Sequence, residues 1–583
     1  MCGRMRLDPH SYADSTQPET ASLALHAAVD FATRTLRATA TLTFRAPGAG
    51  PLDLDTRGLT IHGVTDLAGV PLPFTLHPVD PILGARLAIQ LPPGTAGVTV
   101  AYTTSPDASA LQWLTPAQTA GGKAPFLFSQ CQAIHARSVV PLQDTPRLRI
   151  RFEARISVPE GLTAVMAAAA VGRSDGPEGP TFAFAMPQPI PPYLLAFAVG
   201  DLASRDLGPR SRVWAEPAQL DAAAWEFAGV EAMIVAAESL FGPYDWERFD
   251  VLTMPPSFPY GGMENPRLTF LTPTLLAGDR SLVNVLAHEL AHSWTGNLVT
   301  NANAEHFWLN EGFTVYAERR ILEALEGAEL GAMHAALGRN ALESEVRRFA
   351  ATPGLVRLRT HLDGIDPDDA FSQIPYEKGY LFLRTLEEDV GRPAFSAFLR
   401  RYIRHFAFRS ITTEDFVAFV EAELPGALER VGAAEWLHGE GIPANAPRAR
   451  SERLLALEAL GGAVPTDAQA AEWTPTEWTL YLDSVPRPAS PETCAWLQAR
   501  IGGSENYEIV VSWLKLAIAS GHLDVLPRVE TVLTRVGRMK YLRPLYAALA
   551  ARADTVEFAR RVYASAKEGY HPIARQGIEG ILG

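Results

Sequence analysis

The chain has 583 residues, of which 47% are hydrophobic and 20% charged, a balance typical of globular proteins that bury sizeable cores. At roughly 150 residues per domain, this length predicts about three or four domains. The formal net charge of −14 and the pI near 5.5 argue against nucleic acid or an anionic membrane as the main partner.

The N-terminal stretch has the alternating pattern of β-strands. Apolar and polar residues alternate over 36–44 and 148–158, and turn-forming residues at 92–94 and 121–122 separate shorter strand-like runs. We therefore expect an antiparallel β-sheet domain over residues 1–202.

The chain shows no sign of export or membrane insertion. Residues 1–20 are polar and lack the apolar core of a signal peptide, and no apolar run is long enough to span a membrane. Cys2, Cys131 and Cys494 are scattered, without the CxxC pairs of a metal knuckle or the density of a disulfide framework. We expect a cytoplasmic protein.

Two segments in the first half of the chain combine unusual residues. Gln130 and Gln132 stand in a strand-like run of polar residues, where they either satisfy backbone groups at a domain seam or bind a ligand. Further on, Tyr260 leads into Gly261-Gly262-Met263-Glu264. Two glycines allow the backbone to lie close to a bound peptide, and Glu264 offers a carboxylate.

Helical patterns dominate residues 203–440, and the strongest signal there is His288-Glu289-Leu290-Ala291-His292. Asp279 or Ser281 is expected to cap the start of this helix. On a helix, His288 and His292 lie one turn apart on one face, where two neutral imidazoles can bind one Zn²⁺. Glu289 is then placed to take a proton from a water molecule on the metal. A pair of helix-face histidines without a metal is the alternative interpretation.

Glu311 follows after eighteen intervening residues, near the start of a second helical pattern that ends near Gly327. It completes a His₂Glu site of the kind that catalytic zinc peptidases use. Glu318, two turns further along that face, either orients a ligand imidazole or is an ordinary surface residue. Downstream, the Tyr376 hydroxyl could donate a hydrogen bond to an oxyanion. The local sequence alone favours the alternative that Tyr376 is a packed aromatic residue.

Residues 441–452 have the composition of a linker, and residues 453–583 are predicted to be helical. Thr474 and Ser490 each precede a proline and are expected to cap helices. The recurring short amphipathic helices indicate a stacked array like an α-solenoid.

Taken together, GGMEN and HELAH-(18 residues)-E resemble the signatures of the gluzincin zinc aminopeptidases. The segments QCQAIH, PYEKG and GRMK are similar to the branch that contains leukotriene-A(4) hydrolases and aminopeptidase B. The resemblance implies a multidomain α+β fold: a saddle-like antiparallel β-sheet domain, a thermolysin-like, mainly helical catalytic domain and a solenoid-like C-terminal domain. It also implies one Zn²⁺ per chain and a monomer acting on short peptides.

The resemblance assigns roles to residues that the patterns leave open. In this family the glutamate matching Glu264 binds the free amino terminus of the substrate, and the branch's glutamines, here Gln130 and Gln132, help to hold the N-terminal residue. Tyr260, Gly261, Gly262 and Met263 belong to the same binding segment. Tyr376 matches the tyrosine that stabilises the oxyanion.

Further roles concern the two ends of the pocket. Asp368 matches a carboxylate that can meet a basic N-terminal side chain, and Arg538, with Lys540 second, matches the group that binds the C-terminal carboxylate. Phe371 is a departure, because the branch has a tyrosine at this position.

The expected function is zinc-dependent removal of the N-terminal residue from short peptides, including tripeptides and Arg- or Lys-leading peptides, with Glu289 as general base. Three alternatives remain. A thermolysin-like endopeptidase would have no need of Glu264. An epoxide hydrolase acting on a leukotriene-like lipid could use Asp368 to direct water, and Phe371 weakens that alternative. A non-enzymatic helical scaffold would tolerate the loss of zinc ligands, all of which are present.

Overall fold

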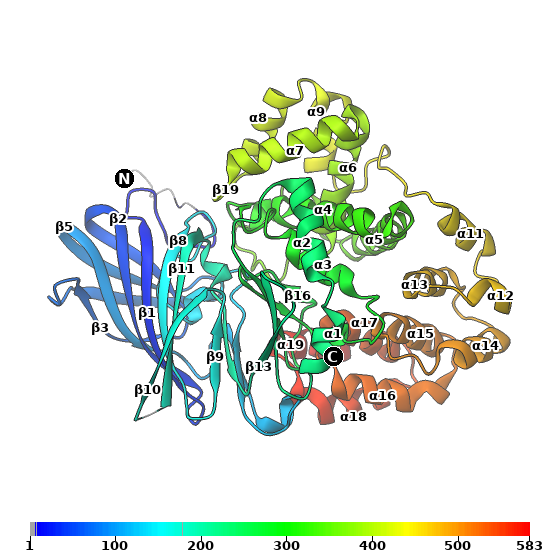
Figure 1. Cartoon of the computed structure of the whole chain (residues 1–583), viewed down its shortest axis with the longest axis horizontal. Helices are drawn as coiled ribbons and strands as arrows, with labels where there is room; N and C mark the ends of the chain where they lie inside the picture. The colour runs from blue at the N-terminus through cyan, green and yellow to red at the C-terminus, as the bar shows by residue number, and fades with distance from the viewer. Residues whose placement is uncertain (1–5, 7, 178) are drawn as a thin grey trace.

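The computed structural model describes residues 6, 8–177 and 179–583. A β-sheet domain at the N-terminus is followed by a mixed central domain and a helical C-terminal domain, which lies to the right of and below the central domain in Figure 1. The architecture therefore has the three domains that were expected. The boundaries at residues 202, 440 and 452 stay predictions.

The N-terminal domain is built on an eight-stranded sheet in the order β10-β11-β8-β1-β2-β5-β3, with β4 paired to β5. Its strands are β1 (Thr20–Asp30), β2 (Thr35–Thr56), β3 (Thr60–Asp66), β4 (Phe74–Asp80), β5 (Gly84–Thr103), β8 (Ile150–Ser157), β10 (Ala169–Gly176) and β11 (Gly179–Ile190). The alternating residues predicted at 36–44 and 148–158 form parts of β2 and β8, with their apolar side chains buried.

One strand pair departs from the expected antiparallel arrangement. β1 and β8 run parallel, with Ser22 opposite Arg151. A parallel pair requires a long crossover connection, and the chain between these strands supplies one. That connection first forms β2 to β5 of the same sheet, and its last part contains β6, β7 and the segment with Gln130 and Gln132. The detour thus carries the two glutamines away from the large sheet.

A second, four-stranded sheet has the order β6-β7-β12-β9. Its strands are β6 (Leu111–Leu114), β7 (Phe126–Ser129), β9 (Thr163–Met166) and β12 (Phe197–Gly200). Gln130 directly follows β7, whose four residues are all buried. The polar segment therefore starts from a rigid position.

The central domain combines a five-stranded sheet with helices. The sheet order is β13-β14-β15-β17-β16, which makes the two-residue strand β16 an edge. The strands are β13 (Ala203–Asp206), β14 (Ser211–Ala215), β15 (Phe249–Thr253), β16 (Gly262–Met263) and β17 (Leu268–Leu271), and a small parallel pair joins β18 (Val299–Asn301) to β19 (Arg409–Ile411). The helices are α1 (Leu220–Glu226), α2 (Val230–Phe241), α3 (Val283–Ala291), α4 (Trp308–Glu326), α5 (Ala328–Arg348), α6 (Gly379–Val390), α7 (Arg392–Phe406), α8 (Thr413–Glu423), α9 (Ala427–Arg430) and α10 (Ala433–His438).

The C-terminal domain consists of short helices stacked side by side, as Figure 1 shows. They are α11 (Glu452–Leu460), α12 (Asp467–Ala470), α13 (Pro475–Ser484), α14 (Pro491–Ile501), α15 (Tyr507–Ala519), α16 (Leu526–Arg535), α17 (Met539–Ala550), α18 (Val556–Ala566) and α19 (Pro572–Leu582). Thr474 and Ser490 cap α13 and α14 as predicted, each accepting a hydrogen bond from the backbone of the first turn.

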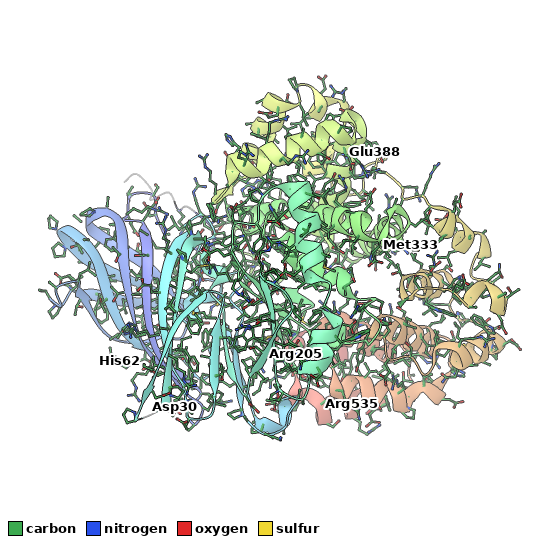
Figure 2. The ribbon with its side chains drawn as sticks, in the orientation of Figure 1. Asp30, His62, Arg205, Met333, Glu388 and Arg535 are labelled. Carbon is green, nitrogen blue, oxygen red and sulfur yellow. The ribbon has the colours of Figure 1, made fainter. Side chains whose placement is uncertain are left out.

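The C-terminal helices are anchored to the central domain through α5. Met333 of α5, labelled in Figure 2, is buried in the same apolar cluster as the cores of α13, α15 and α17. Helix α5 of the central domain therefore shares one apolar core with the helices of the C-terminal domain. Within the described ranges, no helix has both the length and the apolar character needed to cross a membrane.

Candidate metal centre and active-site cleft

The two candidate histidines project from the end of α3. His288 lies within the helix and His292 is its C-terminal cap residue, still in helical conformation. Neither Asp279 nor Ser281 is the N-cap residue: α3 begins after Leu282, and Asp279 instead accepts hydrogen bonds from Ser281. The ring nitrogens His288 Nε2 and His292 Nε2 lie 3.2 Å apart.

Glu311, in the first turn of α4, completes the cluster. Its Oε2 atom lies 3.4 Å from His288 Nε2 and 3.6 Å from His292 Nε2. Helix α4 ends at Glu326 before Gly327, whose φ of 93° favours glycine, so the predicted stop is confirmed. Three ligand atoms from two helices thus converge on one point.

The cluster has the shape and chemistry of a tetrahedral zinc site. Donor atoms about 2.0–2.2 Å from a tetrahedral metal lie roughly 3.4 Å apart, close to the three separations found here. His288 Nδ1 lies 3.0 Å from Glu318 Oε2, and His292 Nδ1 lies 3.1 Å from the Thr295 carbonyl oxygen. Because both neighbours accept hydrogen bonds, both Nδ1 atoms carry the proton in the neutral rings.

The two Nε2 lone pairs therefore point at each other, and they would repel without a cation between them. Glu311 Oε2 is also buried and receives no hydrogen bond from any residue the structure describes. Buried polar atoms normally have partners, so this unsatisfied oxygen fits a metal ligand. Glu318 accordingly holds a ligand ring rather than lying free on the surface.

Glu289 lies against the backbone of the glycine-rich segment. A Cβ atom built on Gly262 would come within 2.1 Å of Glu289 Oε1, so only glycine leaves room for this carboxylate. Burial raises the pKa of Glu289 well above its usual range. A raised pKa makes the carboxylate a stronger base, which suits it to accept a proton.

Tyr376 lies in a single turn of π-helix, residues Ile374–Lys378, a local distortion that is frequent at functional sites. Its ring stacks on His288 with the centroids 6.1 Å apart. Burial raises the pKa of its hydroxyl well above the usual range, which keeps the group a neutral donor. The aromatic ring is thus packed, as the residues suggested, and also placed beside the candidate metal.

Glu264 joins the same polar cluster from the position directly after the edge strand β16. Oxygen or nitrogen atoms of Glu264, Glu289 and His292 all lie within 4.8 Å of one another. Gln132 Nε2 lies 3.4 Å from Glu264 Oε1, and Asn297 Nδ2 donates to the Glu264 carbonyl oxygen at 2.7 Å. Burial, with the nearby Glu311 carboxylate, raises the pKa of Glu264 to about 8, so a cationic partner would stabilise its charged form.

At another part of the cleft, Arg538 lies against Gly261, the first glycine of the Gly261–Glu264 segment. A Cβ atom on Gly261 would come within 2.7 Å of Arg538 Nη2. Arg538 Nη1 donates to the Tyr541 hydroxyl at 2.8 Å and lies 3.8 Å from Glu508 Oε1, whereas Lys540 Nζ lies 2.6 Å from the same oxygen. Although burial opposes the shift, Lys540 and Arg538 lower the pKa of Glu508 to about 2.

A third group of contacts surrounds Asp368. His135 Nε2 lies 2.8 Å from Asp368 Oδ2, and His135 Nδ1 lies 2.8 Å from Ser109 Oγ and 3.2 Å from Arg57 Nη1. Because a guanidinium only donates, Nδ1 accepts and Nε2 carries the proton that Asp368 receives. His135 binds Oδ2, and the other side-chain oxygen of Asp368 is left available to the cleft.

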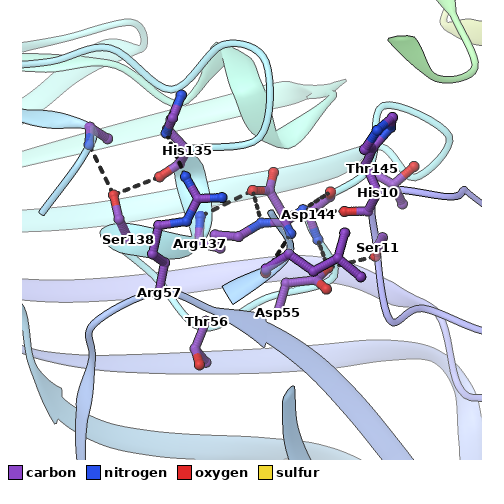
Figure 3. Close-up of polar contacts among 12 residues, drawn as sticks. His10, Ser11, Asp55, Thr56, Arg57, His135, Arg137, Ser138, Asp144 and Thr145 are labelled. Atoms are coloured by element: carbon purple, nitrogen blue, oxygen red, sulfur yellow. Dashed lines mark hydrogen bonds and ion pairs between the residues drawn. The ribbon is translucent and has the colours of Figure 1, made fainter. Parts of the chain in front are cut away.

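The loop of the N-terminal domain that carries His135 is fixed by buried charged residues, which Figure 3 shows. Arg137 is fully buried and its Nε donates to Asp144 Oδ2 at 2.9 Å. Its other nitrogens donate to the carbonyl oxygens of Leu83 and His10. Asp55 accepts from the backbone N–H of Asp144 at 2.8 Å. These contacts hold the loop at the cleft.

A single cavity of about 1050 Å³ connects these groups. Its wall includes nearly all the residues expected from the sequence, namely Gln130, Gln132, Tyr260, Gly261, Gly262, Glu264, His288, Glu289, His292, Glu311, Asp368, Tyr376, Arg538 and Lys540. Met263 is the exception, because it is buried behind the wall, where Gln130 Nε2 lies 3.2 Å from its sulfur atom.

Several contributors could not be assigned from the sequence. His135 stands inside a segment that was singled out, yet its partner Asp368 lies 233 positions away. Asn297 and Thr314 hold Glu264 and His292, and neither carries a local signal. Glu318, by contrast, was indicated by its position two turns beyond Glu311 on the same face of the predicted helix.

Comparisons with known proteins agree with this geometry. Residues 9–194 match the Peptidase M1 N-terminal domain, residues 225–436 the Peptidase family M1 domain and residues 473–582 the Leukotriene A4 hydrolase, C-terminal domain. The chain is 41% identical over 568 residues to leukotriene A-4 hydrolase of Xenopus laevis, covering 92% of this chain and 93% of that protein. It is 40% identical over 568 residues to leucine aminopeptidase 2 of Yarrowia lipolytica, covering 91% and 86%.

A solved structure shows the same similarity in three dimensions. The structure of yeast LTA4 hydrolase in complex with bestatin matches with a TM-score of 0.91 and 32% identity. The match covers all of this chain and 98% of the yeast chain. The similarity therefore extends over the whole three-domain arrangement.

Proposed function

The chain belongs to the M1 peptidase family, with the C-terminal domain of leukotriene A4 hydrolases, and on that premise we propose that it removes the N-terminal residue from short peptides. The family makes it a zinc metallopeptidase, a hydrolase with one catalytic Zn²⁺. The observation that carries an aminopeptidase function is the Glu264 carboxylate beside Glu289 and His292.

His288, His292 and Glu311 would hold the Zn²⁺, which would supply a Lewis acid for the scissile carbonyl group and for a water molecule. Glu289 accepts the proton of the attacking water and returns it to the leaving amine. The Tyr376 hydroxyl donates a hydrogen bond to the oxyanion of the tetrahedral intermediate. Glu318 and the Thr295 carbonyl keep the two imidazole rings in the required tautomers.

The substrate is fixed at both ends. Glu264 and Gln132 bind the free ammonium group, since a buried carboxylate gains most from a cationic partner. Arg538, with Lys540 beside it, receives the peptide carboxylate at the other end. Asp368 accepts a basic side chain of the N-terminal residue. Groups at fixed positions favour dipeptides, tripeptides and other short peptides.

The proposal is tested with free and N-acetylated tripeptides that begin with Arg, Lys, Ala or Leu, with and without a zinc chelator. We expect release of one residue from the free-amine peptides only, and loss of that activity in the chelator. Cleavage of the acetylated peptides at internal bonds would instead support an endopeptidase. Zinc-loaded protein that cleaves no peptide in the panel would contradict the proposal.

A second candidate function rests on the similarity to the Xenopus laevis protein named leukotriene A-4 hydrolase. Phe371 lies edge to face with both Tyr260 and Tyr376, with centroids 6.4 Å and 6.1 Å away, and it offers no hydroxyl group. We expect peptide hydrolysis to exceed conversion of leukotriene A4 to a diol. Assays of both substrates on one zinc-loaded preparation decide between the two activities.

We also propose that the protein acts as a monomer in the reducing cytoplasm. Cys131 and Cys494 are buried free thiols, which fits a reducing compartment. Light scattering coupled to size-exclusion chromatography tests the monomer, with a mass of 63.2 kDa expected.

A further inference from the structure

The cavity continues beyond Arg538 into a cleft between two helices of different domains. On α17, the residues that line it are spaced as one face of a helix: Lys540, Arg543, Pro544 and Ala547. The opposite wall is one face of α5, which includes His334, Gly338, Ala341, Glu345 and Arg348. This extension carries charged groups that the chemistry at the metal does not use.

Most of these charges are already paired. Lys540 Nζ lies 2.6 Å from Glu508 Oε1, and Arg348 Nη2 lies 2.7 Å from Glu345 Oε2. Arg543 differs, because no hydrogen bond or ion pair of its guanidinium group is found across residues 8–177 and 179–583. Burial and the nearby Arg348 lower the pKa of Arg543, and the nearby Glu345 acts in the opposite direction. Glu345 is itself paired with Arg348, so the Arg543 guanidinium has no directly bonded anion among the described residues.

The Arg543 side chain is also held in position. Its Cδ lies 3.9 Å from the place that a Cβ atom on Gly577 of α19 would occupy, so the aliphatic stem packs on that helix. The residue itself is half-buried and its side chain forms part of the cavity wall. A cation held in this way loses little side-chain freedom when it binds an anion.

The position of Arg543 relates to substrate length. Arg538, the N-cap residue of α17, and Arg543 both line the cavity, and their Cα atoms are offset by roughly 7.5 Å along the helix axis. One residue of an extended peptide spans about 3.3–3.6 Å, so this distance corresponds to about two further residues. A peptide that is too long to end at Arg538 would therefore bring its next residues to Arg543.

We propose that Arg543 forms a distal subsite for a carboxylate of peptides about two residues longer than those that end at Arg538. The inference rests on the proposed aminopeptidase function and adds a substrate class to it: peptides of four or five residues with an acidic residue near the C-terminus. The net charge of −14 disfavours anionic ligands elsewhere on the molecule, so this selectivity depends on the local cations.

The test compares two pentapeptide amides, Arg-Ala-Ala-Ala-Glu-NH₂ and Arg-Ala-Ala-Ala-Gln-NH₂, on the zinc-loaded enzyme. Amidation removes the terminal carboxylate, so the glutamate side chain is the anion that distinguishes the two. We expect kcat/KM for the Glu peptide to exceed that for the Gln peptide roughly three- to fivefold, mainly through KM, and to approach it at high salt.

Arg543→Gln should bring the Glu/Gln ratio close to one. Arg560→Gln, which removes a positive charge from exposed α18 of the same domain, should keep the ratio and serves as the matched control. Equal kcat/KM for the two peptides in the unaltered enzyme, or an unchanged ratio in Arg543→Gln, would overturn the distal subsite. Hydrolysis of Arg-Ala-Ala by the same preparation separates that result from a failure of the aminopeptidase function.

Discussion

His135 Nε2 of the N-terminal domain donates a hydrogen bond to Asp368 Oδ2 of the central domain across 2.8 Å. Arg57 and Ser109 fix the tautomer of His135, so the proton lies on the nitrogen that faces Asp368. A residue outside the domain that holds the metal thus orients a charged group of the substrate pocket.

Asp368→Asn should lower kcat/KM for Arg-Ala-Ala by roughly tenfold, because the loss of a partly buried charge pair costs about 1–2 kcal/mol. Hydrolysis of Ala-Ala-Ala should change much less, since its side chain does not reach the carboxylate. The exposed Asp363→Asn is the matched control. Equal losses for both peptides would show that Asp368 acts on folding or on the metal centre rather than on specificity.

Replacing Glu289 by Gln should leave zinc binding intact and lower kcat by about 10²–10⁴-fold, because the amide cannot accept the proton of the attacking water. Metal analysis of the purified variant, together with steady-state kinetics, checks both parts. Near-normal turnover in zinc-loaded Glu289→Gln would remove Glu289 from the role of general base.

Gly262→Ala should reduce activity by at least about tenfold, because the new Cβ atom would lie 2.1 Å from Glu289 Oε1 and displace the carboxylate. The loss should appear in kcat more than in KM, since Glu289 acts on the proton and not on binding. Gly503→Ala, where a Cβ atom meets nothing within 4 Å, is the control. A Gly262→Ala enzyme with normal kcat would contradict this use of the glycine.

His306 should make the protein sensitive to acid. The backbone N–H of Thr413 donates to His306 Nδ1 at 3.0 Å, and burial, with Arg359 nearby, lowers the pKa of His306 to about 4. The neutral ring is therefore required in the fold, while the unfolded chain binds a proton below its ordinary pKa of about 6.5.

Because the pKa of His306 is lower in the folded than in the unfolded chain, its contribution to the free energy of unfolding is complete above pH 6.5. This contribution is lost as the pH falls towards 4, and the loss is roughly 3 kcal/mol at most. Urea unfolding between pH 7 and pH 4, with zinc removed from every sample, measures this loss. His306→Asn should show a shallower decline than the unaltered protein, and the exposed His26→Gln should not. Identical slopes for His306→Asn and the unaltered protein would contradict the assignment.

The parts of the site that follow from sequence are those encoded by local spacing. One turn of helix separates His288 from His292, and the stop at Gly327 depends only on local backbone preference. Helix capping at Thr474 is local in the same sense. Such features need no knowledge of where distant segments lie.

Contacts between distant segments could not be predicted in this way. The parallel pairing of β1 with β8, the contact of Gly262 with Glu289 and the pair of His135 with Asp368 depend on how separate domains pack. The start of α3 was also misjudged, because Asp279 and Ser281 bond to each other and leave Leu282 at the N-cap position. Tertiary packing decides these positions, and a single sequence carries little trace of it.

The cleft takes its metal ligands from α3 and α4 and its distal cations from α17. Substitutions in α17 can therefore alter the length and charge of the peptides that are accepted while the residues that break the bond stay the same. Substrate specificity in such an enzyme can therefore evolve through changes in one C-terminal helix, while the catalytic residues are conserved.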